Sequence, residues 1–444
     1  MNLFECHLKL KEKKISAVEL VQDSLKNFEK ADNNSMISLT YELALKEASW
    51  VDREIARNGV KGPLHGIPYT LKDLFITKGI RTTAGSKILY NYIPPYDGYI
   101  SAQLKKAGAI MMGKVTLDEF GMGSSGEMTP FSVAKNPLNK TKVAGGSSSG
   151  SAVSVAEGTC LFSIGTDTGG SVRLPANFCG LVGFRPSYGR VSRYGQIAYA
   201  SSLDQAGPLA KTVRDLAYVM DAITEKDPRD ATNTSLPSLD MSSRVDQIKP
   251  SFLKGKRIGF CPALIDDCRR DVKGELQRAL SHFKSEGVEL VELDFSYLKY
   301  AVATYYIISC SEASANLARY DGIHYGLSKR NIGNLEEVYA QSRQEGLGSE
   351  VKRRILLGTY SLSSGYYDAY YTKACKIRHL ITKEFKENLK KCDAIFFPVS
   401  GVTAFSRSEI EEPLKMYLND LYTIPVNLAS LPGLAIPLTE LFHH

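Results

Sequence analysis

Segments with helical spacing of their apolar residues alternate with short apolar runs along most of the chain. Two such pairs are AQLKKAGAIMMGKVT, from Ala102, and SAVSVAEGTCLFSIGTD, from Ser151. In each pair a helical period of about 3.6 residues gives way to a run typical of a buried strand. Strands that alternate with helices usually lie in a sheet that helices cover on both faces. The alternation therefore predicts an α/β protein with a covered, mostly buried sheet.

Capping residues mark the helices near the N-terminus. The segment ISAVELVQDSLKNFEK starts at Ile15, and its Ser16 precedes Glu19 by three residues, as in a capping box. A second helix is expected in TYELALKEASWVDREIARNG, where Gly59 closes the helix. The next segment, GPLHGIPYTLKDLF from Gly62, predicts a loop that leads into a strand.

The second half of the chain changes character at a polar segment. From about Asp227 to Lys256 small polar residues and prolines predict a long surface loop or a boundary. Beyond it, KRIGFCPA and GVELVELDF predict strands on either side of the helix DVKGELQRALSHFKSEG. Tyrosine-rich helices are expected as far as about Asn388, followed by strands in DAIFFPVSG and LPGLAIPL.

Composition places the chain among soluble globular proteins. Of its 444 residues 43% are hydrophobic and 23% are charged, and the formal net charge is +7. The lysines are scattered rather than gathered in a basic arm, so charge alone does not indicate a nucleic-acid-binding protein. The eight cysteines form no Cys-x-x-Cys pair, and no run of 18 apolar residues occurs. We therefore expect a protein of a reducing cytoplasm, with neither membrane span nor signal peptide.

The sequence does not indicate a serine-histidine-aspartate hydrolase. Only seven histidines occur, two of them at the end of the chain, and no convincing Gly-x-Ser-x-Gly elbow is present. A phosphate loop of the type Gly-x-x-x-x-Gly-Lys-Ser/Thr is also missing. Lys72, in the apolar segment IPYTLKDLF, is the remaining candidate for a general base, because burial lowers the proton affinity of an amine. The alternative is an ordinary surface lysine beside Asp73.

Two glycine-serine runs lie within the apolar middle of the chain. The first, GGSSSGS at 145–151, has the composition of a flexible linker. The second, TDTGGS at 166–171, could direct consecutive backbone N–H groups at one oxygen and so form an oxyanion hole. A tight glycine turn between a strand and a helix explains the second run equally well.

Taken together, these features resemble the amidase signature family. The chain has Lys72 in a GIP-x-x-x-KD setting, then GGSSSGS, then GTDTGGSVRLPA from Gly165, and an interval of 24 residues separates Ser147 from Ser171. The resemblance implies a catalytic triad with Ser171 as nucleophile, Ser147 behind a cis peptide bond, and Lys72 as base. It also implies an oxyanion hole, which Ser124 helps to form and whose backbone donors are those of Thr168, Gly169 and Gly170.

The resemblance extends over essentially the whole chain and implies a single domain, 1–444. The expected fold is a large central mixed β-sheet covered by helices on both faces, with a catalytic core at about 60–215. Residues 257–444 are expected to add helices and strands that complete the sheet and a substrate pocket. Family members continue for several tens of residues after LPGLAIPL, so we expect a shortened C-terminus.

Further segments resemble one branch of the family, the A subunits of the tRNA-dependent amidotransferases. They are FRPSYGRVSRYGQIAYASSLDQAGPLA, SEASANLARYDGIHYG, VKRRILLGTYSLSSGYYDAYY and NDLYTIPVNLASLPGL. The resemblance implies a glutaminase whose ammonia is used by a B subunit, which activates Glu-tRNA(Gln) with ATP and Mg²⁺, while a C subunit joins the two in a heterotrimer. It implies no cofactor in this chain. Use of Asp-tRNA(Asn), and location in bacterial cytoplasm or an organelle matrix, stay open.

Glutamine recognition needs a cation for the α-carboxylate and an anion for the α-ammonium. By the resemblance Arg354 binds the carboxylate and Asp420 the ammonium, with Ser124 and Tyr305 in the same pocket. The sequence does not separate Arg354 from Arg353, nor Tyr305 from Tyr306. Two other functions are compatible with the motifs, namely a stand-alone amidase for small amides and a catalytically silent scaffold subunit.

Overall fold

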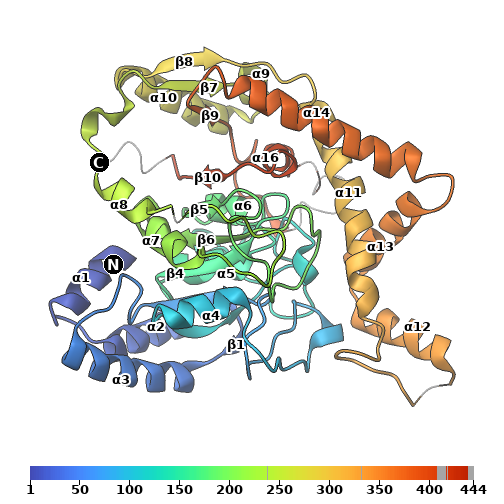
Figure 1. Cartoon of the computed structure of the whole chain (residues 1–444), viewed down its shortest axis with the longest axis horizontal. Helices are drawn as coiled ribbons and strands as arrows, with labels where there is room; N and C mark the ends of the chain where they lie inside the picture. The colour runs from blue at the N-terminus through green and yellow to red at the C-terminus, as the bar shows by residue number, and fades with distance from the viewer. Residues whose placement is uncertain (238, 332, 408–416, 418, 439–444) are drawn as a thin grey trace.

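The computed structural model describes residues 1–444 except 238, 332, 408–416, 418 and 439–444. Within the described residues a seven-stranded mixed sheet forms the centre of the molecule (Figure 1), in the order β1-β3-β2-β4-β6-β5-β10. Its strands are β1 (Met36–Leu39), β2 (Pro68–Lys72), β3 (Ile110–Val115), β4 (Phe162–Thr166), β5 (Val182–Arg185), β6 (Ala206–Ala210) and β10 (Gly433–Ala435).

The middle of this sheet is parallel and its edges are antiparallel. β2 pairs in parallel with β3 and β4, whereas β6, β5, β10 and β1 add antiparallel pairs. β2, β3 and β4 are buried along their full length, as the continuous apolar runs in the sequence predict. Lys72 and Thr166 are the last residues of β2 and β4. Because these strands are parallel neighbours, the two residues lie side by side at the carboxyl ends of the strands.

Helices cover both faces of the central sheet. On one face, buried side chains of the strands pack in a common core with α1 (Leu3–Lys11), α2 (Ala17–Ala31), α3 (Tyr41–Asn58), α4 (Tyr99–Lys106) and α7 (Val213–Ile223). A smaller core joins the other face to α5 (Ser149–Ala156) and α6 (Arg173–Phe178). Side chains alternate between the two cores along a strand, as in β6, where Ala206 and Ala210 face the first core and Leu209 the second.

A second sheet lies apart from the first one. Its three strands within the described residues run in parallel in the order β8-β7-β9, near the top of Figure 1. The bounds are β7 (Arg257–Phe260), β8 (Glu289–Glu292) and β9 (Ala394–Phe396), and the neighbouring helices are α9 (Pro262–Asp266) and α10 (Arg270–Ser285). The expectation that strands after residue 257 complete the main sheet is therefore correct only for β10.

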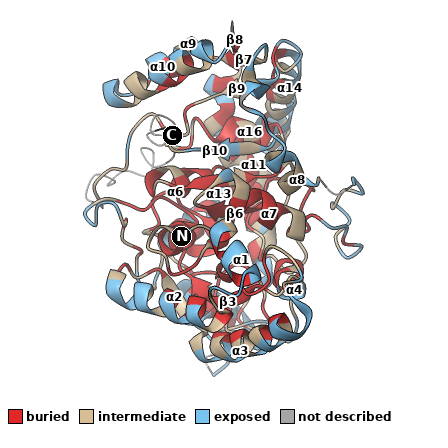
Figure 2. Ribbon diagram, turned by 90° about the vertical axis from the view of Figure 1, so that its left-hand side faces the viewer, coloured by how far each residue is buried: buried red, intermediate tan, exposed pale blue. Residues whose placement is uncertain are grey.

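A group of helices connects the two sheets. The α11 helix is central to this group, because it contacts α13, α14 and α16. Figure 2 shows that buried residues concentrate around the central sheet, while α10, α2 and α3 present exposed faces. The bounds are α11 (Ala301–Asn316), α12 (Leu335–Gly346), α13 (Ser349–Leu362), α14 (Lys373–Asn388) and α16 (Ile424–Leu428).

Most expectations about single elements are confirmed. The Ser16 side chain and Glu19 form the capping box of α2, and Gly59 ends α3 with a positive φ of 73°. The polar segment 227–256 is not entirely loop, because α8 (Met241–Asp246) forms within it and packs on α7. The expected shortening of the C-terminus concerns residues 439–444, which lie outside the described residues. No helix in the described part of the chain is long and apolar enough to cross a membrane.

Candidate active site

Lys72 occupies the centre of a polar cluster at the end of β2. Thr70 and Lys72 point to the α5 face of the sheet, whereas Tyr69 and Leu71 belong to the opposite core. The Lys72 amine lies 2.8 Å from the Ser147 hydroxyl, 2.9 Å from that of Ser148 and 2.8 Å from that of Thr166. Because side chains alternate along β2, Lys72 points to the same face of the sheet as Thr70. The side chains that surround its amine on that face are small and polar rather than apolar.

The environment of Lys72 favours the neutral amine. The side chain is fully buried, and burial lowers its pKa to about 7, although the charges of Asp118, Asp167 and Asp204 oppose this shift. A neutral amine has two N–H donors and one lone pair. It can therefore donate to two of its three hydroxyl neighbours and accept a proton from the third, as a general base must.

Asp73 does not pair with Lys72, although the two are adjacent in sequence. Its carboxylate lies 3.0 Å from the amine of Lys114, a second fully buried lysine, and accepts hydrogen bonds from the backbone and side chain of Thr83. The interpretation of Lys72 as a surface lysine beside an aspartate is therefore wrong. Because Asp73 is paired with Lys114, it does not form an ion pair with Lys72 that would hold the proton of that amine.

The glycine-serine run at 145–151 is a rigid, buried part of the site and not a linker. The peptide bond between Gly146 and Ser147 is cis, as the family resemblance implies. The next residue, Ser148, donates its backbone N–H to the Ser171 carbonyl at 3.2 Å, which holds the two serine runs together. Lys72 and Ser147 are fully buried, whereas Ser171 keeps 8% of its surface exposed. Of the three residues expected to form the triad, Ser171 is thus the one with exposed surface.

Backbone N–H groups next to Ser171 are free to bind an oxyanion. Within the described residues, the N–H groups of Thr168, Gly169 and Ser171 have no hydrogen-bond partner. Gly170 differs from the expectation, because its N–H donates to the Asp167 carboxylate at 2.9 Å and is not available. Gly169 lies directly under Tyr305, where a Cβ atom would come within 2.7 Å of the tyrosine ring, so only glycine fits there.

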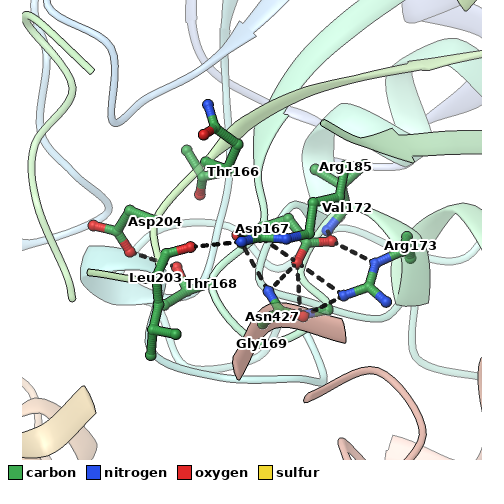
Figure 3. Close-up of polar contacts among 12 residues, drawn as sticks. Thr166, Asp167, Thr168, Gly169, Val172, Arg173, Arg185, Leu203, Asp204 and Asn427 are labelled. Atoms are coloured by element: carbon green, nitrogen blue, oxygen red, sulfur yellow. Dashed lines mark hydrogen bonds and ion pairs between the residues drawn. The ribbon is translucent and has the colours of Figure 1, made fainter. Parts of the chain in front are cut away.

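Asp167 organises the turn that carries these N–H groups (Figure 3). Its carboxylate pairs with the Arg173 guanidinium at 3.0 Å and accepts a hydrogen bond from Asn427 at 2.7 Å. Arg185 donates to the Asp167 carbonyl. One residue further on, the Thr168 hydroxyl donates to Asp204 at 2.7 Å. The turn is therefore fixed on both sides, which leaves its unpaired N–H groups preorganised.

Asp420, Ser124 and Arg354 are buried and form with Tyr306 a polar cluster, which we call the candidate pocket. The Ser124 hydroxyl lies 2.8 Å from both oxygens of the Asp420 carboxylate, and the Tyr306 hydroxyl donates to it at 2.9 Å. Burial raises the pKa of Asp420 to about 6, while hydrogen bonds from Ser124 and Tyr306 lower it. Ser124 thus contacts Asp420 rather than the turn at 168–171, and Tyr306, not Tyr305, is the tyrosine hydrogen-bonded to Asp420.

Arg354 forms the cationic side of the same pocket. It is almost fully buried, and its Nε donates to Glu350 at 2.8 Å while one terminal nitrogen donates to the Tyr199 hydroxyl at 2.7 Å. The other terminal nitrogen, Nη2, is buried without a partner among the described residues. The side chain of Arg353 is 45% exposed and binds the other Glu350 oxygen, so Arg354 is the arginine that faces the pocket.

Tyr306 joins the two charged groups. The Arg354 guanidinium lies 5.2 Å from the centre of the Tyr306 ring, whose hydroxyl is bonded to Asp420. The cluster therefore offers an unpaired arginine N–H and a carboxylate, which match the carboxylate and ammonium of a free amino acid. No cluster of three or more histidine, cysteine, aspartate or glutamate side chains suited to a metal ion occurs in the described part of the chain.

Sequence reasoning did not identify several residues of this site. Ser148 and Thr166 lie inside the motifs that carry the resemblance, so their positions were available as a signal. Glu350 holds Arg354 from four residues earlier on the same helix, a spacing that the sequence displays. Tyr199 holds Arg354 from a distant segment, and nothing local in the sequence points to it. The remaining members support the turn at 166–171, namely Asp167, Arg173, Arg185, Asp204 and Asn427.

Comparison with known proteins agrees with this geometry. The family model described as Amidase matches residues 19–441. The chain belongs to the amidase family. Among solved structures, this amidase is similar to the A subunit of the glutamyl-tRNA(Gln) amidotransferase of Thermotoga maritima, with a TM-score of 0.79 and 39% identity over 98% of this chain and 87% of that one.

Similarity among curated proteins is higher still. The amidase is 48% identical to the A subunit of the glutamyl-tRNA(Gln) amidotransferase of Geobacter sulfurreducens over 441 residues, 98% of this chain and 90% of the relative. It also resembles a peptide amidase of Stenotrophomonas maltophilia, with a TM-score of 0.81 but only 27% identity over 99% of this chain and 90% of that one. The mixed sheet covered by helices is thus the amidase signature fold that the motifs predict.

Proposed function

We propose that this amidase is the glutamine-hydrolysing subunit of a tRNA-dependent amidotransferase. The observation that carries the proposal is a pair of buried groups of opposite charge on either side of Tyr306, the unpartnered Nη2 of Arg354 and the carboxylate of Asp420. Together they fit the two ends of a free amino acid. High identity to the A subunits of glutamyl-tRNA(Gln) amidotransferases over nearly the whole chain supports the same substrate.

In the first half-reaction neutral Lys72 takes the hydroxyl proton of Ser147, to which it is hydrogen-bonded. Ser147 in turn takes the hydroxyl proton of Ser171. The Ser171 oxygen then attacks the side-chain amide carbon of glutamine, and the negative charge forms on the amide oxygen. N–H groups of Thr168, Gly169 and Ser171 stabilise this oxyanion. The carbon–nitrogen bond breaks as the proton returns through Ser147 to the leaving nitrogen, so ammonia departs and a glutamyl ester remains on Ser171.

In the second half-reaction water attacks the glutamyl ester. The same relay removes a proton from the water and returns it to Ser171, which releases glutamate and restores the enzyme. Arg354 and Asp420 hold the α-carboxylate and the α-ammonium throughout, so the side-chain amide stays directed at Ser171.

The ammonia is proposed to serve one of two partner chains, in a heterotrimer in the cytoplasm. One of them, the B subunit, would activate Glu-tRNA(Gln), or Asp-tRNA(Asn), with ATP and Mg²⁺, and the C subunit would join the other two chains. The relatives are themselves A subunits of such enzymes, which supports partner subunits of this kind. ATP and Mg²⁺ would act in the partner, and this chain would supply ammonia alone.

The test is ammonia release from glutamine by the chain alone, and then with B and C subunits, Glu-tRNA(Gln) and ATP. We expect release that the partners stimulate and that Ser171→Ala reduces on the order of 10⁴-fold. Hydrolysis of other amides with glutamine ignored would identify a stand-alone amidase instead. Binding to the partners without release from any amide would identify a scaffold subunit.

A further inference from the structure

Glu119 is a buried carboxylate that the reaction described above does not use. Only 4% of its surface is exposed, and burial raises its pKa to about 7. It lies at the start of the segment 118–128, which we call the Ser124 loop because it carries that residue. Its side chain, however, does not bond within the loop, so its contacts elsewhere call for an explanation.

The carboxylate of Glu119 reaches two other parts of the chain. One oxygen contacts the Ser86 hydroxyl, which also lies 3.0 Å from the Gly346 carbonyl. The other oxygen accepts the backbone N–H of Gly348 at 2.8 Å. A Cβ atom on Gly348 would lie 2.2 Å from that oxygen, so this close approach requires glycine. Glu119 therefore connects the Ser124 loop to the segment that begins α13.

Gly348 is the N-cap residue of α13, and no side chain of the helix itself caps it. The Glu119 carboxylate accepts one of the N–H groups that every helix leaves unpaired at its N-terminus, where a negative charge is also favourable. Two residues later α13 carries Glu350, which is bonded to Arg354. Glu119 thus fixes the end of the helix from which the arginine of the pocket extends.

The Ser124 loop forms the other side of the pocket. Ser124 donates to Asp420, and its carbonyl accepts the N–H of Gly146 at 2.8 Å. The loop is closed near its ends, because Glu119 donates its own backbone N–H to the Met128 carbonyl at 2.6 Å. A shift of the loop against α13 would therefore change the separation between Asp420 and Arg354.

We propose that Glu119 is a positioning residue for glutamine, which sets the separation between the groups that bind its α-ammonium and its α-carboxylate. This inference rests on the proposed function of the site. Glu119 touches neither the substrate nor the triad, so it acts on the fit of the amino-acid end and not on the chemistry at Ser171. Its removal should weaken glutamine binding and leave the attack on simpler acyl groups intact.

The experiment compares Glu119→Ala with Glu119→Gln in the form of the enzyme that releases ammonia. In Glu119→Ala we expect KM for glutamine to rise about tenfold or more, because a buried N–H is left unpaired and a contact between two elements is lost. We expect kcat to change little. The Glu119→Gln side chain keeps an oxygen that can accept the N–H of Gly348, so this variant should restore most of the affinity for the substrate.

Two controls separate positioning from a general structural role. Hydrolysis of 4-nitrophenyl acetate, which has neither an α-ammonium nor an α-carboxylate, should be the same in wild type and Glu119→Ala. The matched variant is Glu157→Ala, which removes another largely buried glutamate, bonded to Ser35 and Thr159 away from the pocket. It should leave KM for glutamine unchanged even if it lowers the stability of the protein.

An unchanged KM for glutamine in Glu119→Ala would overturn the inference. So would a loss of activity towards 4-nitrophenyl acetate as large as the loss towards glutamine, or a comparable rise in KM in Glu157→Ala. A different result would show that the proposed function itself is wrong. A wild-type enzyme that cleaves the ester but releases no ammonia from glutamine would refute the pocket assignment, and the inference with it.

Discussion

Lys72 and Asp420 are both buried, and burial shifts their pKa values in opposite directions. The amine of Lys72 loses affinity for its proton, whereas the carboxyl of Asp420 gains affinity, because low polarity disfavours the charged form of each. The two values, about 7 and about 6, bring both groups into the range where modest changes in pH alter their charge. Given the proposed roles of the two residues, we expect their titrations to affect different kinetic constants.

For Lys72 we predict that kcat rises with pH through about 7. Below this value the amine is protonated and cannot accept the proton of Ser147, whereas above it the neutral base predominates. The measurement is ammonia release at saturating glutamine between about pH 5.5 and 9. A rise of kcat only near the ordinary pKa of a lysine would show that Lys72 is charged at neutral pH and would contradict its proposed role as base.

For Asp420 we predict that KM for glutamine falls as pH rises through about 6. The carboxyl is neutral at lower pH and cannot attract the α-ammonium, and it becomes a carboxylate at higher pH. Asp420→Asn should raise KM by about 100-fold and remove this pH dependence, since the charged partner is lost for good. A variant that keeps the wild-type pH profile of KM would assign the titration to another group.

At the scale of elements, the turn between β4 and α6 depends on one buried aspartate. Burial alone would raise the pKa of Asp167, but the charges of Arg173 and Arg185 hold it well below its usual range. The stabilisation from this ionised group is therefore present above the pKa of an unfolded aspartate and is lost only as the pH falls toward the lower folded value. Near neutral pH the network is fully formed.

We predict that Asp167→Asn lowers the free energy of unfolding by about 3–5 kcal/mol, because two buried arginines lose their counter-ion. Urea denaturation followed by circular dichroism measures the change. The matched control is Glu387→Gln, which breaks the exposed pair with Lys390 and should leave stability almost unchanged, because solvent screens that pair. Equal effects of the two substitutions would show that Asp167 contributes no more than a surface charge.

For the whole molecule, the two sheets differ in how deeply they are buried. β2, β3 and β4 are buried at every residue, whereas β8 is exposed at both ends and β9 is only partly buried. Lys72, the candidate base, and its neighbour Thr166 are on strands of the deeply buried sheet, so the candidate site rests on a well-protected part of the fold.

We predict that backbone amides of β2, β3 and β4 exchange with deuterium more slowly than those of β7, β8 and β9. Local opening needs less free energy where strands are short and partly exposed. Hydrogen exchange followed by mass spectrometry of peptides measures this difference. Equal protection of both sheets would show that they unfold as one unit.

Local sequence signals were sufficient for elements whose cause is local. The capping box of α2, the glycine end of α3 and the fully buried β3 follow from period, caps and composition, and the structure confirms them. The distribution of the strands between two sheets could not be predicted from local signals, because strands pair with partners that are far apart in the sequence. The β7 strand, for example, pairs with β9, more than a hundred residues later in the chain.

The sequence by itself determined the α/β class and the amidase family and predicted the triad Lys72, Ser147 and Ser171, since each motif is a short run of residues and the order and spacing of the motifs are characteristic. Only the tertiary structure decided between Arg354 and Arg353, and showed Tyr306 rather than Tyr305 hydrogen-bonded to Asp420. Adjacent residues on a helix point in different directions, and which direction faces a pocket depends on how the helix packs. The role of each neighbouring pair is therefore set by contacts between distant segments.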